Sequence, residues 1–218
     1  MNAPRERERS DPESAARFTR RLESFSDLVF GLSLSLAAAR LIVPPHAADI
    51  FAKPFGLVAF VTTFAAIAGL WLGSHRSFEL FFEPSRIDVA AVFVRLMGVA
   101  VMPYALQTVL TFSLVLQPLL LYNAVFILIL AANSTIAVRG YLRHAAGWSF
   151  AKRRRAWRIV CMLLALVVAF AIDTGLALYR VSYGWNGYFL ISLAAVLSGR
   201  LSRIWAPPLP SAAAAPRA

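Results

Sequence analysis

The chain has 218 residues, of which 59% are hydrophobic, and this excess over the roughly 45–50% of soluble domains excludes an ordinary soluble fold. Its formal net charge is +11, but the basic residues flank long apolar runs, which favours membrane orientation and contact with anionic lipid over nucleic-acid binding. The single cysteine, Cys161, excludes an intrachain disulfide and any cysteine-based metal site.

Six apolar runs follow a polar opening. We expect residues 1–23 to form a mobile cytoplasmic tail. Each run is long enough for a helix to cross the ~30 Å hydrocarbon core, where backbone polar groups must bond within the helix. The runs cover residues 25–43, 54–73, 89–112, 116–138, 159–178 and 188–204. The sequence therefore predicts an all-α, polytopic membrane protein with a six-helix domain over residues 24–205 and a disordered tail over 206–218.

The distribution of basic residues predicts the orientation of these spans. Eighteen of the 22 Lys and Arg residues fall on one side of the predicted spans, three on the other, and Arg95 lies within the third span. The positive-inside rule places the richer side, with both termini, in the cytoplasm of a bacterial-type inner membrane. A cleaved signal peptide is the competing interpretation of the first run, but Asp27 interrupts its start and five more runs follow.

Four ionisable residues fall inside predicted spans, where a charge is costly without a partner. From their depths we expect Asp27 to pair with Arg95, and Arg40 to pair with Asp173. The alternative for both arginines is that the guanidinium extends to the membrane surface. None of these residues belongs to a hydrolase, metalloprotease or phosphate-binding motif, so we expect neither an enzyme nor a bound cofactor or metal.

The first span carries an unusual mixture of side chains on one helical face. Arg21, Phe25 and Leu28 share this face by helical spacing, and it continues through the following residues: Leu32, Ser35, Leu36 and Ala39. Small and hydroxyl residues are typical of helix–helix contacts or of surfaces along water. Periodicity alone leaves both a packing face and a pore wall open.

The start of this span resembles the hallmark of the transmembrane protein 175 family of potassium channels, in its prokaryotic form with a single six-helix repeat. The pattern R-x-x-x-F-S-D is formed by Arg21, Phe25, Ser26 and Asp27, and Pro44 closes the span. Further similarity lies in the segment from Trp71 to Phe78, which includes His75, and in the Met102-Pro103-Tyr104 segment.

This resemblance implies four chains around one ion path lined by the first helices. It assigns a hydrophobic constriction to Leu32 and Leu36, a hydroxyl selectivity layer to Ser35, and the outer pore to Ala39 and Arg40. It also implies that the inner end of the first helix is held to its neighbours by a structural group of residues, namely Arg21, Phe25, Ser26, Asp27, Trp71 and His75. The sequence departs from the family at Leu28, Ser35, Ala39 and Arg40, where glycine, threonine, a bulky apolar residue and an acidic residue are common.

The function implied is passive transport of potassium ions across the lipid bilayer by a homotetrameric channel. A proton- or ion-coupled transporter that uses Asp27 or Asp173 as a relay is the alternative from another class. A non-conducting member of the family is the third possibility. Transporters often contain internal repeats, but the Arg21–Asp27 motif occurs only once in this sequence, so it gives the transporter no support.

Overall fold

The computed structural model describes residues 12–39, 41, 45–46, 55–112 and 115–179, and within them the regular structure is helical, with no strand. The helices are α1 (Pro12–Ala39), α3 (Phe55–Leu80), α4 (Arg86–Phe112), α5 (Leu116–His144), the short 3-10 helix η1 (Ala145–Gly147) and α6 (Phe150–Leu178). Among these, α1, α4, α5 and α6 are each long and apolar enough to cross a membrane. The all-α prediction is confirmed for this part of the chain, whereas the run at 188–204 lies outside the described residues.

Several helices extend well beyond the apolar runs that predicted them. α1 begins at Pro12, so residues 12–23, which we expected in a mobile tail, are helical. α3 continues to Leu80 and α5 to His144. Arg, Glu and Ala favour helix as strongly as apolar residues do, and proline is well tolerated in the first turn. Hydropathy therefore locates the apolar segment of a helix, but it does not locate the residues at which the helix begins and ends.

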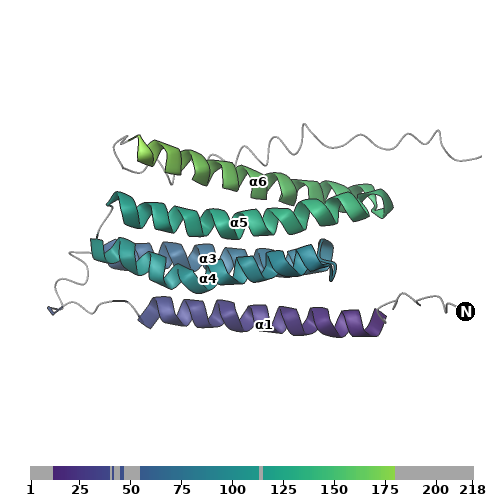
Figure 1. Cartoon of the computed structure of the whole chain (residues 1–218), viewed down its shortest axis with the longest axis horizontal. Helices are drawn as coiled ribbons and strands as arrows, with labels where there is room; N and C mark the ends of the chain where they lie inside the picture. The colour runs from purple at the N-terminus through teal and green to yellow at the C-terminus, as the bar shows by residue number, and fades with distance from the viewer. Residues whose placement is uncertain (1–11, 40, 42–44, 47–54, 113–114, 180–218) are drawn as a thin grey trace, which may run out of the picture.

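The helices lie side by side, with α1 at one edge, α6 at the other, and α3, α4 and α5 between them (Figure 1). α1 packs against α4 and α3, and α6 packs against α5. The start of α1, the α3–α4 turn and the α5–α6 turn share one end of the bundle (Figure 1). Apart from Arg95, the described Lys and Arg residues belong to the helix segments toward this end, which we call the basic end. As an edge helix, α1 has only one side covered by the other described helices.

Two glycines allow neighbouring segments of the bundle to approach closely. A Cβ at Gly98 of α4 would come within 2.6 Å of Ile129 Cγ1 on α5. A Cβ at Gly140 of α5 would overlap the backbone of Phe81, at the end of α3. Pro103 is buried inside α4, which continues through it to Phe112.

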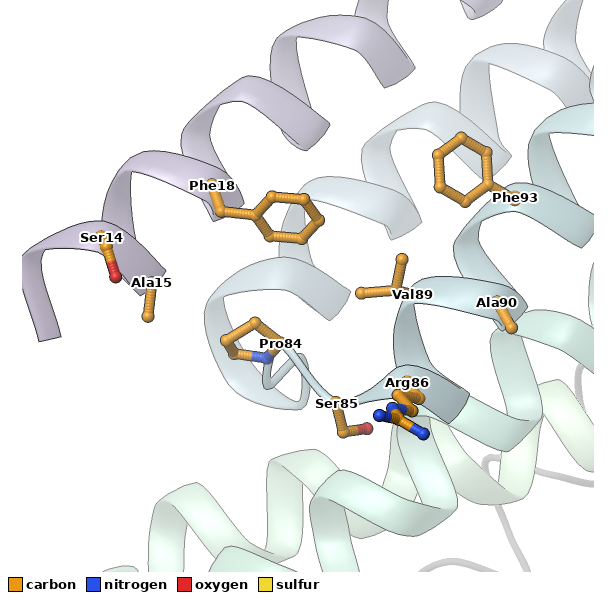
Figure 2. Close-up of a pocket in the computed structure, with 9 residues that line it drawn as sticks. All are labelled: Ser14, Ala15, Phe18, Pro84, Ser85, Arg86, Val89, Ala90 and Phe93. Carbon is orange, nitrogen blue, oxygen red and sulfur yellow. The ribbon is translucent and has the colours of Figure 1, made fainter. Parts of the chain in front are cut away.

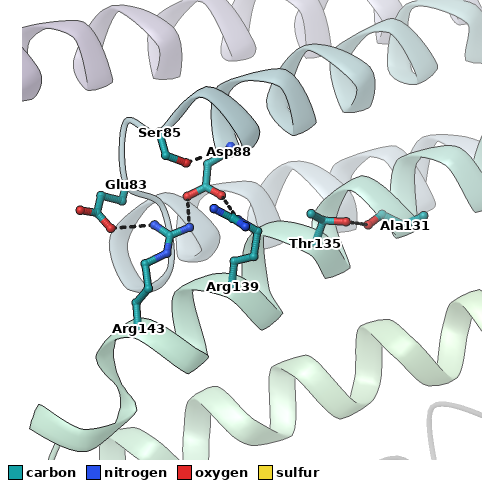
Figure 3. A network of polar contacts seen from close by, with 7 residues as sticks. All are labelled: Glu83, Ser85, Asp88, Ala131, Thr135, Arg139 and Arg143. Atoms are coloured by element: carbon teal, nitrogen blue, oxygen red, sulfur yellow. Dashed lines mark hydrogen bonds and ion pairs between the residues drawn. The ribbon is translucent and has the colours of Figure 1, made fainter.

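A buried ion-pair network joins the α3–α4 turn to α5 at the basic end (Figure 3). Asp88, in the first turn of α4, is fully buried, and its carboxylate accepts hydrogen bonds from Arg139 Nε at 2.9 Å and from Arg143 Nη2. Arg143 Nη1 also donates to Glu83 Oε2 at 2.7 Å. The Asp88 backbone N–H donates to Ser85 Oγ, which caps the start of α4. The network therefore connects residues more than fifty positions apart and orients α4 against α5.

Replacing Asp88 by asparagine should destabilise the protein strongly, because it leaves two arginines facing a neutral amide. We expect a loss of about 3 kcal/mol, the lower end for breaking a buried ion pair, since both arginines are partly exposed. Thermal unfolding in detergent measures this. Glu83→Gln is the matched control: Glu83 is exposed and should contribute under about 1 kcal/mol. Equal effects of the two substitutions would contradict the central role of Asp88.

Candidate functional site

The two sides of α1 have opposite environments. One side is buried against α3 and α4, and its buried residues are Leu22, Ser26, Phe30, Ser33 and Ala37. On the other side, Leu28, Leu32 and Leu36 are 71%, 62% and 44% exposed, and Ser35 and Ala39 are exposed as well. The described helices of this chain therefore do not cover the face that contains Leu32 and Ser35. No described helix packs on that face, and the predicted span over residues 188–204 lies outside the described residues.

The serines of α1 are arranged differently on the two faces. Ser35 Oγ donates to the carbonyl oxygen of Gly31 at 3.0 Å, and the hydroxyl stays exposed. Ser33 is buried, and its Oγ donates to Val29 O at 2.8 Å. A Cβ at Gly31 would meet nothing within 4 Å, so no neighbour in the described chain requires a glycine there. Arg40, the predicted outer pore residue, lies outside the described residues.

Two side-chain contacts join α1 to α3. Trp71 Nε1 donates to Asp27 Oδ1 at 2.8 Å, and His75 Nδ1 lies 2.8 Å from Glu23 Oε1. The rings of Trp71 and His75 meet edge to face with their centroids 5.0 Å apart. We call these four residues the α1–α3 contact. Glu23 was not among the predicted site residues, although its position one helical turn before Asp27 is the signal that could have identified it.

The other motif residues have separate environments. Ser26 is buried and its Oγ donates to Leu22 O within α1. Phe25 is half exposed, with its ring centroid 6.2 Å from that of Phe93 on α4. Arg21 is exposed and forms no hydrogen bond or ion pair with the described residues. Within one chain, Arg21 is therefore not part of the α1–α3 contact.

The expected pairing of Asp27 with Arg95 is wrong. Arg95 is fully buried, its Nη1 donates to Asn133 Oδ1 at 3.0 Å, and its guanidinium lies over the Phe78 ring. Matched depth was not sufficient, because Asp27 lies on the exposed side of α1 while Arg95 points into the bundle.

Of the second expected pair, Arg40 with Asp173, the structure describes only Asp173. Asp173 accepts a hydrogen bond from Asn123 Nδ2 at 2.7 Å, which joins α6 to α5. Arg40 lies outside the described residues, so that pair stays a prediction.

A pocket of about 550 Å³ lies at the basic end, between the start of α1 and the start of α4 (Figure 2). Phe18 projects from α1 toward Val89 of α4 across it (Figure 2). It is lined by Ser14, Ala15, Phe18, Pro84, Ser85, Arg86, Val89, Ala90 and Phe93. None of the predicted pore residues lines this mainly apolar pocket, and no group of three metal-ligating side chains occurs in the described residues.

Comparison with known proteins supports the resemblance carried by the Arg21–Asp27 motif. Residues 21–103 match the sequence profile of the family described as endosomal/lysosomal potassium channel TMEM175. A protein from Chamaesiphon minutus that is named a potassium channel is 36% identical over 73 residues, which cover 28% of this chain and 34% of the relative. The chain thus aligns with about a third of that relative's length. The family match contains most of α1, all of α3 and α4 as far as Pro103, and the predicted resemblance is confirmed over these residues.

The Asp27–Trp71 hydrogen bond should contribute measurably to the stability of α1 packing. Trp71→Phe removes the indole N–H that Asp27 accepts and should lower stability by about 1 kcal/mol beyond the loss of ring volume. Thermal unfolding in detergent measures this. Trp157→Phe is the matched control, because Trp157 is equally half-buried and its Nε1 has no partner among the described residues. If both substitutions lowered the unfolding temperature equally, the bond would have no net effect.

Proposed function

We propose that this chain, whose residues 21–103 match a family of potassium channels, is one subunit of a passive, potassium-conducting channel in a bacterial-type inner membrane. Four copies would surround a central path, each contributing α1 to its wall. Six spans and cytoplasmic termini belong to the same proposal. Both the family match and the uncovered face of α1 support it.

The uncovered face of α1 is the observation that carries the proposal. A helix edge that met only lipid would have no use for the exposed hydroxyl of Ser35 or for the small residues Gly31 and Ala39. Around a shared axis, the side chains of this face would line a path that passes large apolar, hydroxyl and small residues in turn. Because α1 is an edge helix among the described elements, a second copy can approach this face without displacing another described helix (Figure 1).

Leu32 supplies the constriction in this arrangement, and Leu36 a second apolar ring about 6 Å further along the helix. Four leucine side chains that meet on an axis exclude water, and a dewetted gap is a barrier to an ion. Their large exposure in a single chain leaves them available for that contact. Ala39 and Arg40 would follow toward the outer mouth.

Ser35 is suited to contact a partly dehydrated cation between these leucines. Its hydroxyl proton is donated to the Gly31 carbonyl, so the lone pairs of Oγ are directed away from the helix. Four such oxygens would replace part of the hydration shell of a potassium ion. The carbonyl-lined filter of other potassium channels has no counterpart in the sequence, so any preference would depend on this hydroxyl layer.

The α1–α3 contact would hold the pore face in its orientation. Successive residues of an α-helix are 100° apart, so a small rotation of α1 would move Leu32 away from a central axis. The Asp27–Trp71 and Glu23–His75 contacts oppose that rotation. In this proposal the motif residues position the pore and do not touch the ion.

Widening the proposed constriction by shortening the side chain at Leu32 should increase the ion current. We expect Leu32→Ala to raise potassium flux in liposomes about tenfold or more, which corresponds to a barrier ~1.4 kcal/mol lower. Leu164→Ala on α6 is the matched control: Leu164 is 44% exposed and belongs to a helix on the far edge of the bundle. An absence of current in both wild type and Leu32→Ala, or flux that depends on a proton gradient, would refute the channel in favour of a scaffold or a coupled transporter.

Substitutions should separate the effect of the hydroxyl layer on ion selectivity from the effect of the constriction on ion current. Ser35→Ala should lose most of the preference for potassium over sodium, measured as a shift of the reversal potential between the two ions, while current persists. Ser33→Ala removes a neighbouring hydroxyl that is buried and bonded to Val29, and it should leave the reversal potential unchanged. Selectivity that is identical in wild type and Ser35→Ala would exclude Ser35 from the ion path.

A further inference from the structure

Arg95 carries a positive charge in the middle of the helix bundle. It lies nine residues after the start of α4, about 14 Å along the helix, and its side chain is 0% exposed. Its Nη1 donates to Asn133 Oδ1 on α5, and its Cζ lies 5.3 Å from the centre of the Phe78 ring on α3. The guanidinium is thus enclosed by three helices.

One whole edge of this guanidinium has no partner among the described residues. Nε and Nη2 are buried and form no hydrogen bond with the described residues. The N–H groups of these two nitrogens point the same way along one edge of the planar group, and this parallel pair is the geometry that binds an anion in a bidentate manner. Asn133 occupies the other end of the guanidinium, so the free donors are concentrated on one side.

The described carboxylates do not neutralise this charge. Each is engaged elsewhere or exposed: Glu13 lies near Arg17, Glu23 and Asp27 contact α3, Glu83 and Asp88 bind arginines of α5, Asp173 accepts from Asn123, and Glu79 is exposed. A guanidinium is protonated at neutral pH. A buried charge without a counter-charge is strongly unfavourable, so a compensating anion is expected.

Two further hydroxyls on α3 and α5 are also without a partner in the described part of the chain. Ser77 and Ser134 are buried, and their Oγ atoms have no partner among the described residues. They are the chain neighbours of Phe78 and Asn133, the two residues that contact Arg95. Arginine N–H and serine O–H groups are the donors that a halide accepts from.

We propose that Arg95 binds a small monovalent anion of the halide class, most simply chloride, between α3, α4 and α5. The complete burial of Arg95 excludes a lipid headgroup, and its single positive charge matches a single negative one. The bound ion neutralises Arg95 and joins the three helices, so it stabilises the fold of each subunit. This role is separate from cation passage along α1.

Chloride should therefore raise the thermal stability of the full-length protein in detergent. The unfolding temperature is measured while chloride replaces gluconate, which is too large for a buried site, at constant potassium and ionic strength. Wild type should become more stable as chloride increases, because a ligand of the folded state shifts the unfolding equilibrium. Arg95→Gln should show no dependence on chloride, whereas Arg86→Gln, an exposed arginine of the same helix, should respond as wild type does. Wild-type stability independent of chloride, or an equal response in Arg95→Gln, would overturn the proposal.

Anomalous diffraction from wild-type crystals grown with bromide tests the site directly and does not need the variant to fold. A bromide peak within hydrogen-bonding distance of Arg95 Nε and Nη2 is expected. Water, or a carboxylate from Glu6, Glu8, Asp11 or Asp49, which lie outside the described residues, at that position would overturn it. Neither experiment measures ion flux, so each outcome is independent of the proposed channel.

Discussion

The packing of α1 against α3 and α4 sets the direction of every side chain on that helix. Its buried side is filled by Leu22, Phe30 and Ala37, and Asp27 and Glu23 contact side chains of α3. With one side committed to the bundle, the other side must face outward. The exposure of Leu32 and Ser35 is therefore a consequence of how α1 is anchored, and a shared pore would depend on the same anchoring.

Two buried charges in this bundle have different surroundings. Asp88 is fully enclosed and balanced by Arg139 and Arg143, whose side chains reach partly into solvent. Arg95 is equally enclosed, yet its described contacts are a neutral amide and an aromatic ring. The first arrangement satisfies both charge and hydrogen bonding within one chain. At Arg95 the described contacts satisfy the hydrogen bonding only in part and supply no opposite charge. This difference is why a bound counter-ion is inferred at Arg95, whereas Asp88 needs none.

Sequence reasoning located helices well and side-chain partners poorly. Five expected spans coincide with helices because the demand for internal backbone bonding in lipid acts on each segment separately. The expected Asp27–Arg95 pair is wrong because equal depth in the membrane does not fix the direction of a side chain. Contact also requires that the two side chains face each other. The Asp88–Arg139 and Glu23–His75 contacts were missed for the same reason: they join residues 51 and 52 positions apart.

The sequence by itself determined the helical class, the position of the apolar segments and the asymmetry of basic residues, since these follow from local composition and spacing. It also contained the Arg21–Asp27 motif, over which the resemblance to potassium channels is confirmed. Only the tertiary structure decided that Leu32, Ser35 and Leu36 lie on the uncovered side of an edge helix, and that Trp71 meets Asp27. Burial and partner choice depend on the rotation of each helix relative to its neighbours, and that rotation is set by packing of the whole bundle.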